Sequence, residues 1–185
     1  MTKPATRVGV ARVMFLAVLI LFAWGPSASA ATHVVFVPMD FGPGSLRDAV
    51  AMAGSGDTIQ INLPLEIALT SEIVIDKDLT ITGMGSSTVI SGSNATRMFR
   101  ITAGKVEFRD LVLRSGRVAG GDGASAQAGG GGGGGGATGG AIFIDTGAHV
   151  TLERVQVNDS KAIGGNGGNS TGGSNLTGGS GGTGA

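Results

Sequence analysis

From Asp57 onward, apolar and polar residues alternate with a period of two, in short runs separated by turn residues. This alternation is typical of β-strands, because successive side chains point to opposite faces of a strand. We therefore expect each run to be a short strand with two side chains directed inward. The inward pairs are Ile59/Ile61, Ile67/Leu69, Ile73/Ile75, Leu79/Ile81, Phe99/Ile101, Val106/Phe108, Leu111/Leu113, Ile142/Ile144, Val150/Leu152 and Val155/Val157.

These pairs repeat along the chain in groups of three. Residues 97–121 align with residues 141–165 without a gap, at a shift of about 44 residues, although the strand phase slips by one near Ile142. Residues 99–113 align in turn with residues 67–81. Three strands and three turns in about 20 to 25 residues suit one coil of a β-helix. The pattern predicts an all-β fold, a parallel β-helix of about three coils.

Two glycine-rich segments leave this repeat at equivalent points. One is an insertion over residues 120–140, and the other begins at Gly164 and continues as a tail over residues 166–185. An insertion at one corner of a stacked coil projects to one side and disturbs no core position. We interpret residues 58–165 as the coils and the insertion as a dispensable corner loop. A β-sandwich of hairpins is the alternative, but it does not predict equivalent insertion points.

The segment before the coils, residues 31–57, has a different pattern and predicts an N-terminal cap. Residues 32–37 form one apolar, strand-like run, and a Gly-Pro-Gly turn follows. Ser45 and Asp48 then have capping-box spacing, and apolar residues follow at helical intervals. We therefore expect one short capping helix over residues 45–53, with Ser45 as its N-cap.

Outward side chains should form columns, because equivalent positions of successive coils stack about 4.8 Å apart. Opposite charges that meet in a column help to set the register, although each exposed pair contributes only about 0 to 1 kcal/mol. This gives most charged residues a structural role. The expected columns are Asp76/Arg109/Glu153, Glu72/Lys105/His149 and Thr70/Thr102/Thr146.

Residues 1–30 have the three parts of a secretory signal peptide. Lys3, Arg7 and Arg12 make a positive start, residues 13–24 are apolar and uncharged, and an Ala-Ser-Ala sequence precedes Ala31. The apolar run is shorter than the roughly 20 residues that span a bilayer. We predict cleavage before Ala31, a secreted, cell-surface or outer-membrane location, and no transmembrane helix in the mature chain.

Composition narrows the classes of function further. The formal net charge is zero and only 14% of residues are charged, so no basic surface indicates a nucleic-acid partner. Cysteine and tyrosine are absent, and the single tryptophan lies in the export segment. Disulfides, Cys-based metal sites and an aromatic platform for sugars are therefore not expected. The 36 glycines lack the Gly-X-Y period of collagen.

The start of the mature chain resembles that of bacterial secreted and surface β-helix proteins. Residues 40–50 read DFGPGSLRDAV and residues 56–59 read GDTI. Over residues 34–165 the chain is similar to the polymorphic outer-membrane-protein and autotransporter-passenger type, within the pectate-lyase-like superfamily. The resemblance implies a right-handed helix, and the stop after about three coils suggests a truncated or fragmentary reading of a longer protein. Similarity to the coil motifs lies at residues 78–83, 90–95 and 139–142.

The resemblance also directs attention to acidic clusters, which enzymes of that superfamily place on adjacent coils. Asp76, Asp78 and Asp110 are the acidic residues that the alignment brings closest. Asp78 and Asp110 should stack, with Arg154 next in the column, and a carboxylate pair can bind a cation or act in hydrolysis. Asp is also common in turns before strands, which is the interpretation that we favour here.

The two histidines, His33 and His149, show no Ser-His-Asp spacing, and we interpret both as surface residues. We expect no catalytic, cofactor-binding or metal-binding residues. The predicted function is that of an exported, non-enzymatic adhesin, passenger or structural scaffold, whose partner is a surface or host polysaccharide or protein. A polysaccharide lyase or glycoside hydrolase on the same fold is the alternative, because a fold does not fix a function.

Overall fold

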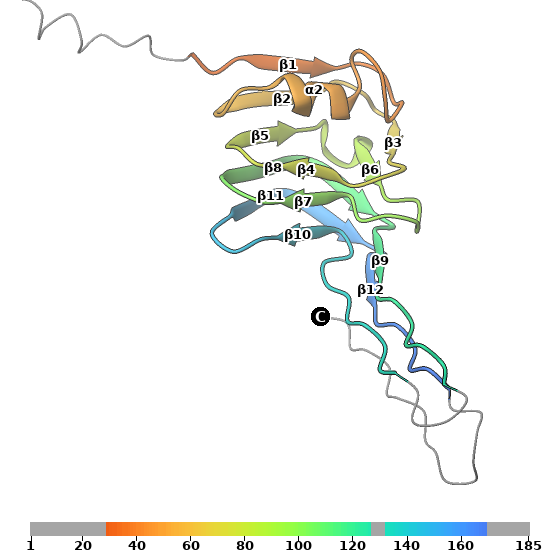
Figure 1. Ribbon diagram of the computed structural model, residues 1–185. Coiled ribbons are helices and arrows are strands. Elements are labelled where there is room, and N and C mark those ends of the chain that lie inside the picture. The colour runs from red at the N-terminus through yellow and green to blue at the C-terminus, as the bar shows by residue number, and fades with distance from the viewer. Residues whose placement is uncertain (1–28, 127–131, 170–185) are drawn as a thin grey trace, which may run out of the picture.

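The computed structural model describes residues 29–126 and 132–169 (Figure 1). The segment before Ser29 and the tail beyond Asn169 therefore lie outside the described residues, and so does most of the expected signal peptide. Strands dominate the described part, with one α-helix. The elements are β1 (Thr32–Val35), α2 (Leu46–Met52), β2 (Asp57–Ile61), β3 (Glu66–Ala68), β4 (Ile73–Ile75), β5 (Leu79–Thr82), the 3₁₀ turn η1 (Gly85–Ser87), β6 (Val89–Ser91), β7 (Phe99–Ile101), β8 (Lys105–Arg114), β9 (Arg117–Ala119), β10 (Ile142–Ile144), β11 (His149–Asn158) and β12 (Lys161–Ile163).

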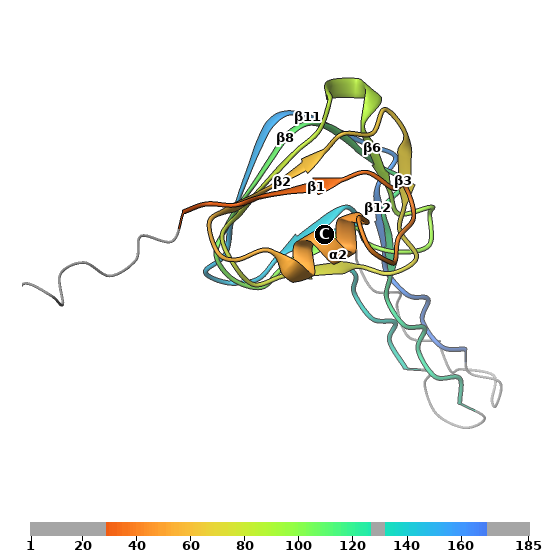
Figure 2. The same ribbon diagram turned by 90° about the horizontal axis from the view of Figure 1, so that it is seen from above.

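The strands pair in parallel and form three sheets that the chain visits in turn. The largest sheet is curled and runs β1-β2-β5-β8-β6-β3, with β11 paired to β8. The second sheet runs β10-β7-β4, and the third contains β12 and β9. Seen from above, the sheets surround one interior and α2 lies across its end (Figure 2). The described part is therefore all-β and mostly parallel, with a single helix.

The ladder between β8 and β11 confirms the 44-residue repeat. Val106 pairs with Val150 along this ladder, 44 residues apart. Arg154 donates a hydrogen bond to Asp110 across it, at the same spacing. β9 and β12 keep the same spacing. β7 and β10 pair one residue out of that spacing, with Phe99 opposite Ile142, which is the slip in phase that the sequence indicates at this point.

The bends of the backbone repeat as well. Asp110 and Arg154 both have left-handed backbone, with φ of 52° and 53°, and Ser115 and Asp159 follow with 54° and 51°. Left-handed backbone is uncommon for residues other than glycine, and arginine is not among the residue types enriched there. Its recurrence at equivalent positions shows that the bend belongs to the repeat.

The alignment of residues 99–113 with residues 67–81 is wrong. β7 pairs with β4, so Phe99 lies opposite Ile73 rather than Ile67. The first half of β8 pairs with β5 and the second half with β6, a strand that the alternation did not reveal. The excursion that contains η1 separates β5 from β6, whereas β8 passes the same bend unbroken. The short apolar pairs resemble one another in sequence, so the alignment matched each strand of residues 99–113 to the wrong strand of residues 67–81.

This error displaces the first members of the charged columns. Thr82, not Asp76, lies beside Arg109, and Glu72 forms an ion pair with Arg97 at 3.2 Å. The members that depend on the 44-residue repeat are confirmed, namely Arg109/Glu153 and Lys105/His149.

The expected threonine column is also out of register. The amide of Thr102 donates to the carbonyl of Ile75, and the amide of Asp145 donates to the carbonyl of Ile101. Thr102 therefore lies in register with Asp76 and Asp145, rather than with Thr70 and Thr146.

Helix α2 closes one end of the stack of strands. The Ser45 hydroxyl accepts a hydrogen bond from the amide of Asp48 at 3.2 Å, which confirms the predicted N-cap. Leu46 and Val50 are buried on the face of α2 that contacts β1 and β2. The helix ends at Met52, with Ala53 in extended conformation as its C-cap.

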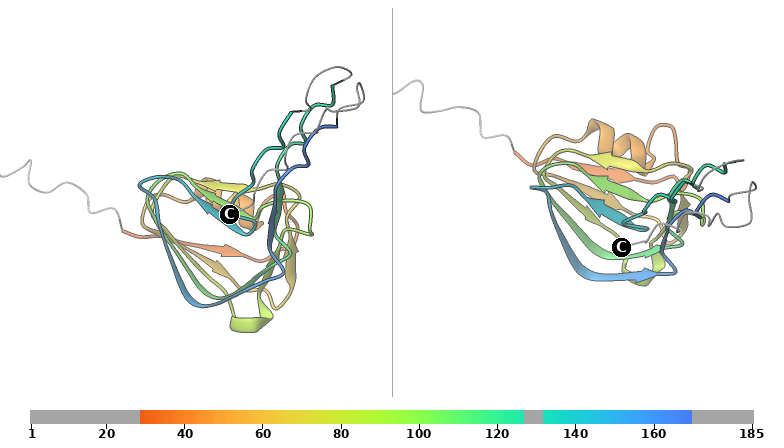
Figure 3. Two further views of the ribbon diagram at one scale, coloured as in Figure 1. Left: turned by 90° about the horizontal axis from the view of Figure 1, so that it is seen from below. Right: turned by 60° about the horizontal axis from the view of Figure 1, so that its bottom comes forward.

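The other end of the stack is open in the described part of the chain. Phe99 and Phe108 fill the interior, with ring centroids 4.9 Å apart. In the lowest strands, Ile144, Leu152 and Val157 continue the inward pattern but are 46%, 47% and 46% exposed. They lie on the teal and blue strands that come forward in Figure 3. Inward position alone therefore does not ensure burial, because burial also needs a covering strand.

Inward and outward residues of β8 should differ sharply in their contribution to stability. Leu111 is buried, whereas the Arg109 side chain is 42% exposed and pairs with Glu107 and Glu153 at 2.8 and 3.2 Å. Leu111→Ala should lower the free energy of unfolding by about 2–5 kcal/mol. Arg109→Ala should lower it by about 1 kcal/mol at most. Denaturant unfolding measures both, and a reversed order would contradict the strand phase.

Candidate functional site

The structure does not bring Asp78 and Asp110 together. Asp78 Oδ1 accepts a hydrogen bond from the amide of Lys105 at 2.7 Å. Asp110 accepts from Arg154 Nε at 2.6 Å and from Arg154 Nη2 at 2.9 Å, and this arginine lowers the pKa of Asp110. The Asp110–Arg154 column is confirmed. The expected Asp78–Asp110 stack is wrong, because Gly83 occupies the position beside Asp110.

A hollow beside Asp78 shows what this carboxylate can reach. Its lining includes Thr80, Lys105, Glu107 and Thr151, so charges of both signs face it. Within the described ranges, no three His, Cys, Asp or Glu side chains converge as a metal site would require. The charged groups here are arranged along the strands rather than around one point.

A buried carboxylate in the cap, Asp40, holds the cap to the first strands. Asp40 accepts from Arg47 Nε at 2.9 Å and from the amide and hydroxyl of Thr70 at 2.9 and 2.6 Å. Arg47 also donates to the carbonyls of Ser71 and Glu72. Burial raises the pKa of Asp40, but the hydrogen bonds from Thr70 and Arg47 outweigh it, and the pKa lies below its ordinary value. The charged pair of the 40–50 segment is thus structural.

Asp57 is a second carboxylate with several partners. Its Oδ1 accepts from the amide of Ala31 at 2.8 Å, and its Oδ2 lies 2.8 Å from both His33 Nε2 and the amide of Gly54. These hydrogen bonds, the one from Ala31 foremost, lower the pKa of Asp57 to about 2. His33 is half-buried beside this carboxylate, with its side chain 20% exposed. His149 does lie exposed at the start of β11.

The glycine-rich segments form an arm that projects from one corner of the body (Figures 1 and 2). We call residues 120–126, 132–140 and 164–169 the glycine arm. Two of its segments follow β9 and β12, which pair in parallel, so they leave the body at the equivalent points that the sequence predicts. The insertion leaves one corner of the body, as the sequence predicts, and its described residues are hydrogen-bonded to one another and to residues 163–169. That it is dispensable stays a prediction.

Backbone hydrogen bonds in the glycine arm recur at every third residue. This is the period of a polyproline II helix, which makes no internal hydrogen bonds and leaves its backbone groups free for neighbouring chains. Each segment donates to one neighbour and accepts from the other, so all three are joined. The N–H to carbonyl bonds run from Gly120, Gly123 and Ala126 to Ile163, Asn166 and Asn169, from Gly132 and Gly135 to Ala124 and Gly121, and from Gly165 and Gly168 to Gly135 and Gly132.

Close packing of the segments explains why the arm is made of glycine. A Cβ on Gly120 would lie 2.1 Å from the carbonyl oxygen of Gly135, and one on Gly165 would lie 2.0 Å from that of Gly121. No side chain fits at such distances, whereas a Cβ on Gly121 would meet nothing within 4 Å. In two segments the crowded glycines lie three residues apart, namely Gly120 and Gly123, and Gly165 and Gly168. In the third segment, Gly134 and Gly140 are crowded and the buried Ala137 lies midway between them.

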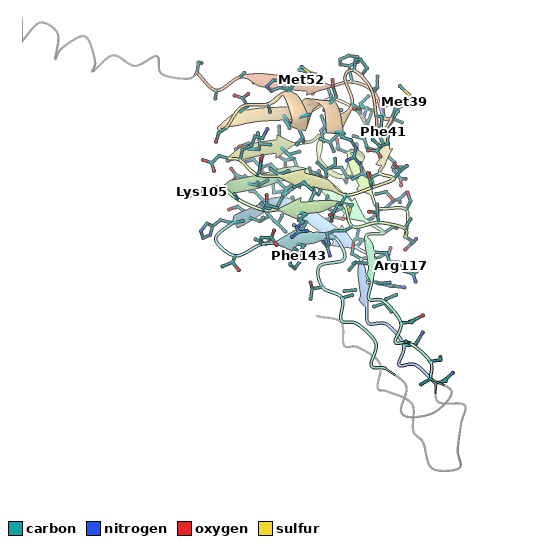
Figure 4. The ribbon with its side chains drawn as sticks, in the orientation of Figure 1. Met39, Phe41, Met52, Lys105, Arg117 and Phe143 are labelled. Atoms are coloured by element: carbon teal, nitrogen blue, oxygen red, sulfur yellow. The ribbon has the colours of Figure 1, made fainter. Side chains whose placement is uncertain are left out.

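Apolar side chains reach the surface of the cap and of β10. Met39, Phe41 and Met52 project from the cap (Figure 4). Phe143 lies on β10 at the other end, with the guanidinium carbon of Arg97 4.8 Å from its ring centroid. The guanidinium carbon of Arg100 lies 5.7 Å from the same centroid, so both arginines lie beside this ring.

Comparison with known proteins adds no relative: no family model matches the chain, and no curated protein or solved structure matches it at a significant level. Within residues 29–126 and 132–169, no helix has the length and apolar character needed to cross a bilayer. Of the features above, the glycine arm is the one that projects from the body as a separate element.

The glycine arm should respond selectively to a single methyl group. Gly120→Ala places a Cβ against the Gly135 carbonyl and should separate the segments, whereas the matched variant Gly121→Ala has room. We expect exchange of the Gly123 and Ala126 amides to accelerate about tenfold or more in Gly120→Ala only. Residue-resolved hydrogen exchange measures this, with the β8 amides as internal reference. Equal protection in both variants would contradict the close packing.

Proposed function

We propose that this protein is an exported, non-enzymatic right-handed parallel β-helix that presents its glycine arm to a surface partner, a polysaccharide or a protein. The observation that carries the proposal is the arm itself. Its three hydrogen-bonded segments are anchored to the body through β9 and β12 and project from one corner (Figure 2).

The repeated geometry supports the β-helix. The chain returns to the same sheets in parallel register, with left-handed bends at equivalent positions. Parallel crossover connections are right-handed in nearly all proteins, which favours that hand here. The resemblance of residues 40–50 and 56–59 to secreted and surface β-helix proteins points to the same architecture.

The disposition of the carboxylates supports a scaffold rather than an enzyme. Glycoside chemistry uses two carboxyl groups that flank one bond, and lyase chemistry on this fold uses a convergent acidic cluster. Asp78 and Asp110 have separate partners, Lys105 and Arg154, and do not share a site. The alternative function, a polysaccharide lyase or glycoside hydrolase, is therefore not supported by a pair of carboxylates at Asp78 and Asp110.

The surface of the arm suits binding without catalysis. Asp122 accepts a hydrogen bond from the amide of Asn166, and Ser125 accepts one from the amide of Asn169. The arm therefore carries polar side chains in addition to its polar backbone groups. A contact surface that is already ordered loses less conformational entropy on binding than a flexible loop. Small polar groups on extended backbone are matched to hydroxyl and amide groups of a polymer.

Binding through the arm is testable with the same pair of glycine variants. Purified wild-type, Gly120→Ala and Gly121→Ala proteins would be added to cells of the source organism, to their isolated surface polysaccharide and to their isolated surface protein. We expect Gly120→Ala to lose about tenfold or more of the wild-type affinity for one fraction, equal to about 1.4 kcal/mol, and Gly121→Ala to retain it.

Circular dichroism would establish that the body of each variant is folded. Equal binding by wild-type and Gly120→Ala proteins would overturn the role of the arm. Turnover of the polysaccharide fraction that Asp78→Asn or Asp110→Asn abolishes would overturn the non-enzymatic assignment.

A further inference from the structure

Ala31 occupies a site that is built around its backbone nitrogen. That nitrogen donates to Asp57 Oδ1 at 2.8 Å, and the Ala31 carbonyl accepts from the amide of Thr58 at 2.8 Å. The next residue, Thr32, begins β1 and pairs with Thr58 in β2. The chain is therefore held on both sides of Ala31, at the residue where the sequence predicts that the mature protein begins.

The receiving carboxylate has three hydrogen-bond partners but no lysine or arginine beside it among the described residues. Asp57 is 8% exposed, and its contacts are the amides of Ala31 and Gly54 and the ring of His33. Among the described residues, no lysine or arginine forms an ion pair with it, and His33 is the ionisable side chain that faces it. Buried carboxylates are ordinarily paired with a cation. In the described part of the chain, Asp57 has no permanently charged positive partner.

We propose that cleavage before Ala31 completes this site: the α-ammonium of the new N-terminus becomes the cationic ligand of Asp57 and fixes the cap to the coils. The inference rests on the proposed export. A signal peptidase adds one water across the Ala30–Ala31 peptide bond, leaving a carboxylate on Ala30 and an ammonium on Ala31. The nitrogen keeps the place that it has in the structure, 2.8 Å from Asp57 Oδ1.

The chemistry of the nitrogen changes in two ways on cleavage. A peptide nitrogen offers one neutral N–H, whereas an ammonium offers several donors and a full charge. Hydrogen bonds between ionised partners are roughly twice as strong as neutral ones. Asp57 also accepts a hydrogen bond from the amide of Gly54, two residues after the end of α2, and lies 2.8 Å from the ring of His33 in β1. Asp57 thus already joins β1, β2 and the end of the helix, and a stronger bond to Ala31 would hold these elements together more tightly in the processed chain.

A shift of one residue in the start of the chain isolates this effect. Recombinant protein would be released from a fusion partner so that it begins at Ala31 or, as matched control, at Ala30. The Ala30 form keeps the Ala31 amide hydrogen bond but moves the charge one residue away. We expect the Ala31 form to melt about 2–4 °C higher. In an Asp57→Asn background the two forms should melt together.

The outcomes separate the ammonium site from export. Equal melting temperatures of the Ala31 and Ala30 forms, or a difference that persists in Asp57→Asn, would overturn the proposed ion pair. If Asp57→Asn prevents folding, reactivity of the α-amine toward an acylating reagent in the native chain decides instead. Slower acylation of the Ala31 form than of the Ala30 form supports the pair, and equal rates overturn it. Mass spectrometry of the exported protein tests the cleavage position independently.

Discussion

Parallel hydrogen bonding between successive passes of the chain is the constraint on which the rest of the structure depends. Each strand lies in register with its counterpart in the next pass, so Val106 lies on Val150 and Lys105 on His149. A slip of one residue would turn every inward side chain outward. The register therefore decides at once which residues form the core, which charges meet outside, and where Asp110 and Arg154 bend the backbone.

In the glycine arm, too, backbone groups are hydrogen-bonded between neighbouring segments, but the packing differs. In the body, backbone groups pair between strands and side chains fill the interior. In the arm the segments approach so closely that a Cβ on Gly120 or Gly165 would lie about 2 Å from a backbone carbonyl oxygen, so these crowded positions are glycine. The β9–β12 pair joins the two regions, because both segments leave it in register. The arm is thus an ordered extension of the stack.

The sequence revealed those features that rest on a local or repeated pattern. Ser45 and Asp48 mark the helix, and the match between residues 97–121 and 141–165 marks the register of β8 with β11. The sequence alignment was wrong around η1. There a short excursion separates β5 from β6, whereas the corresponding pass of the chain is the single strand β8. The partners of Asp57 and Asp40 also escaped notice, because a carboxylate gives no sign in the sequence of which distant backbone amides it will meet.

Cross-linking across the β8–β11 ladder tests the register most directly, because the chain has no cysteine of its own. Glu107 and Thr151 are directly paired. Their Cα atoms should lie about 4.8 Å apart, within the range of a disulfide. Glu107 and Glu153 should lie about 8 Å apart, beyond it. Oxidation should close a disulfide in the Glu107→Cys/Thr151→Cys protein and leave Glu107→Cys/Glu153→Cys reduced. Equal closure of both pairs, or closure of the second alone, would contradict the 44-residue register.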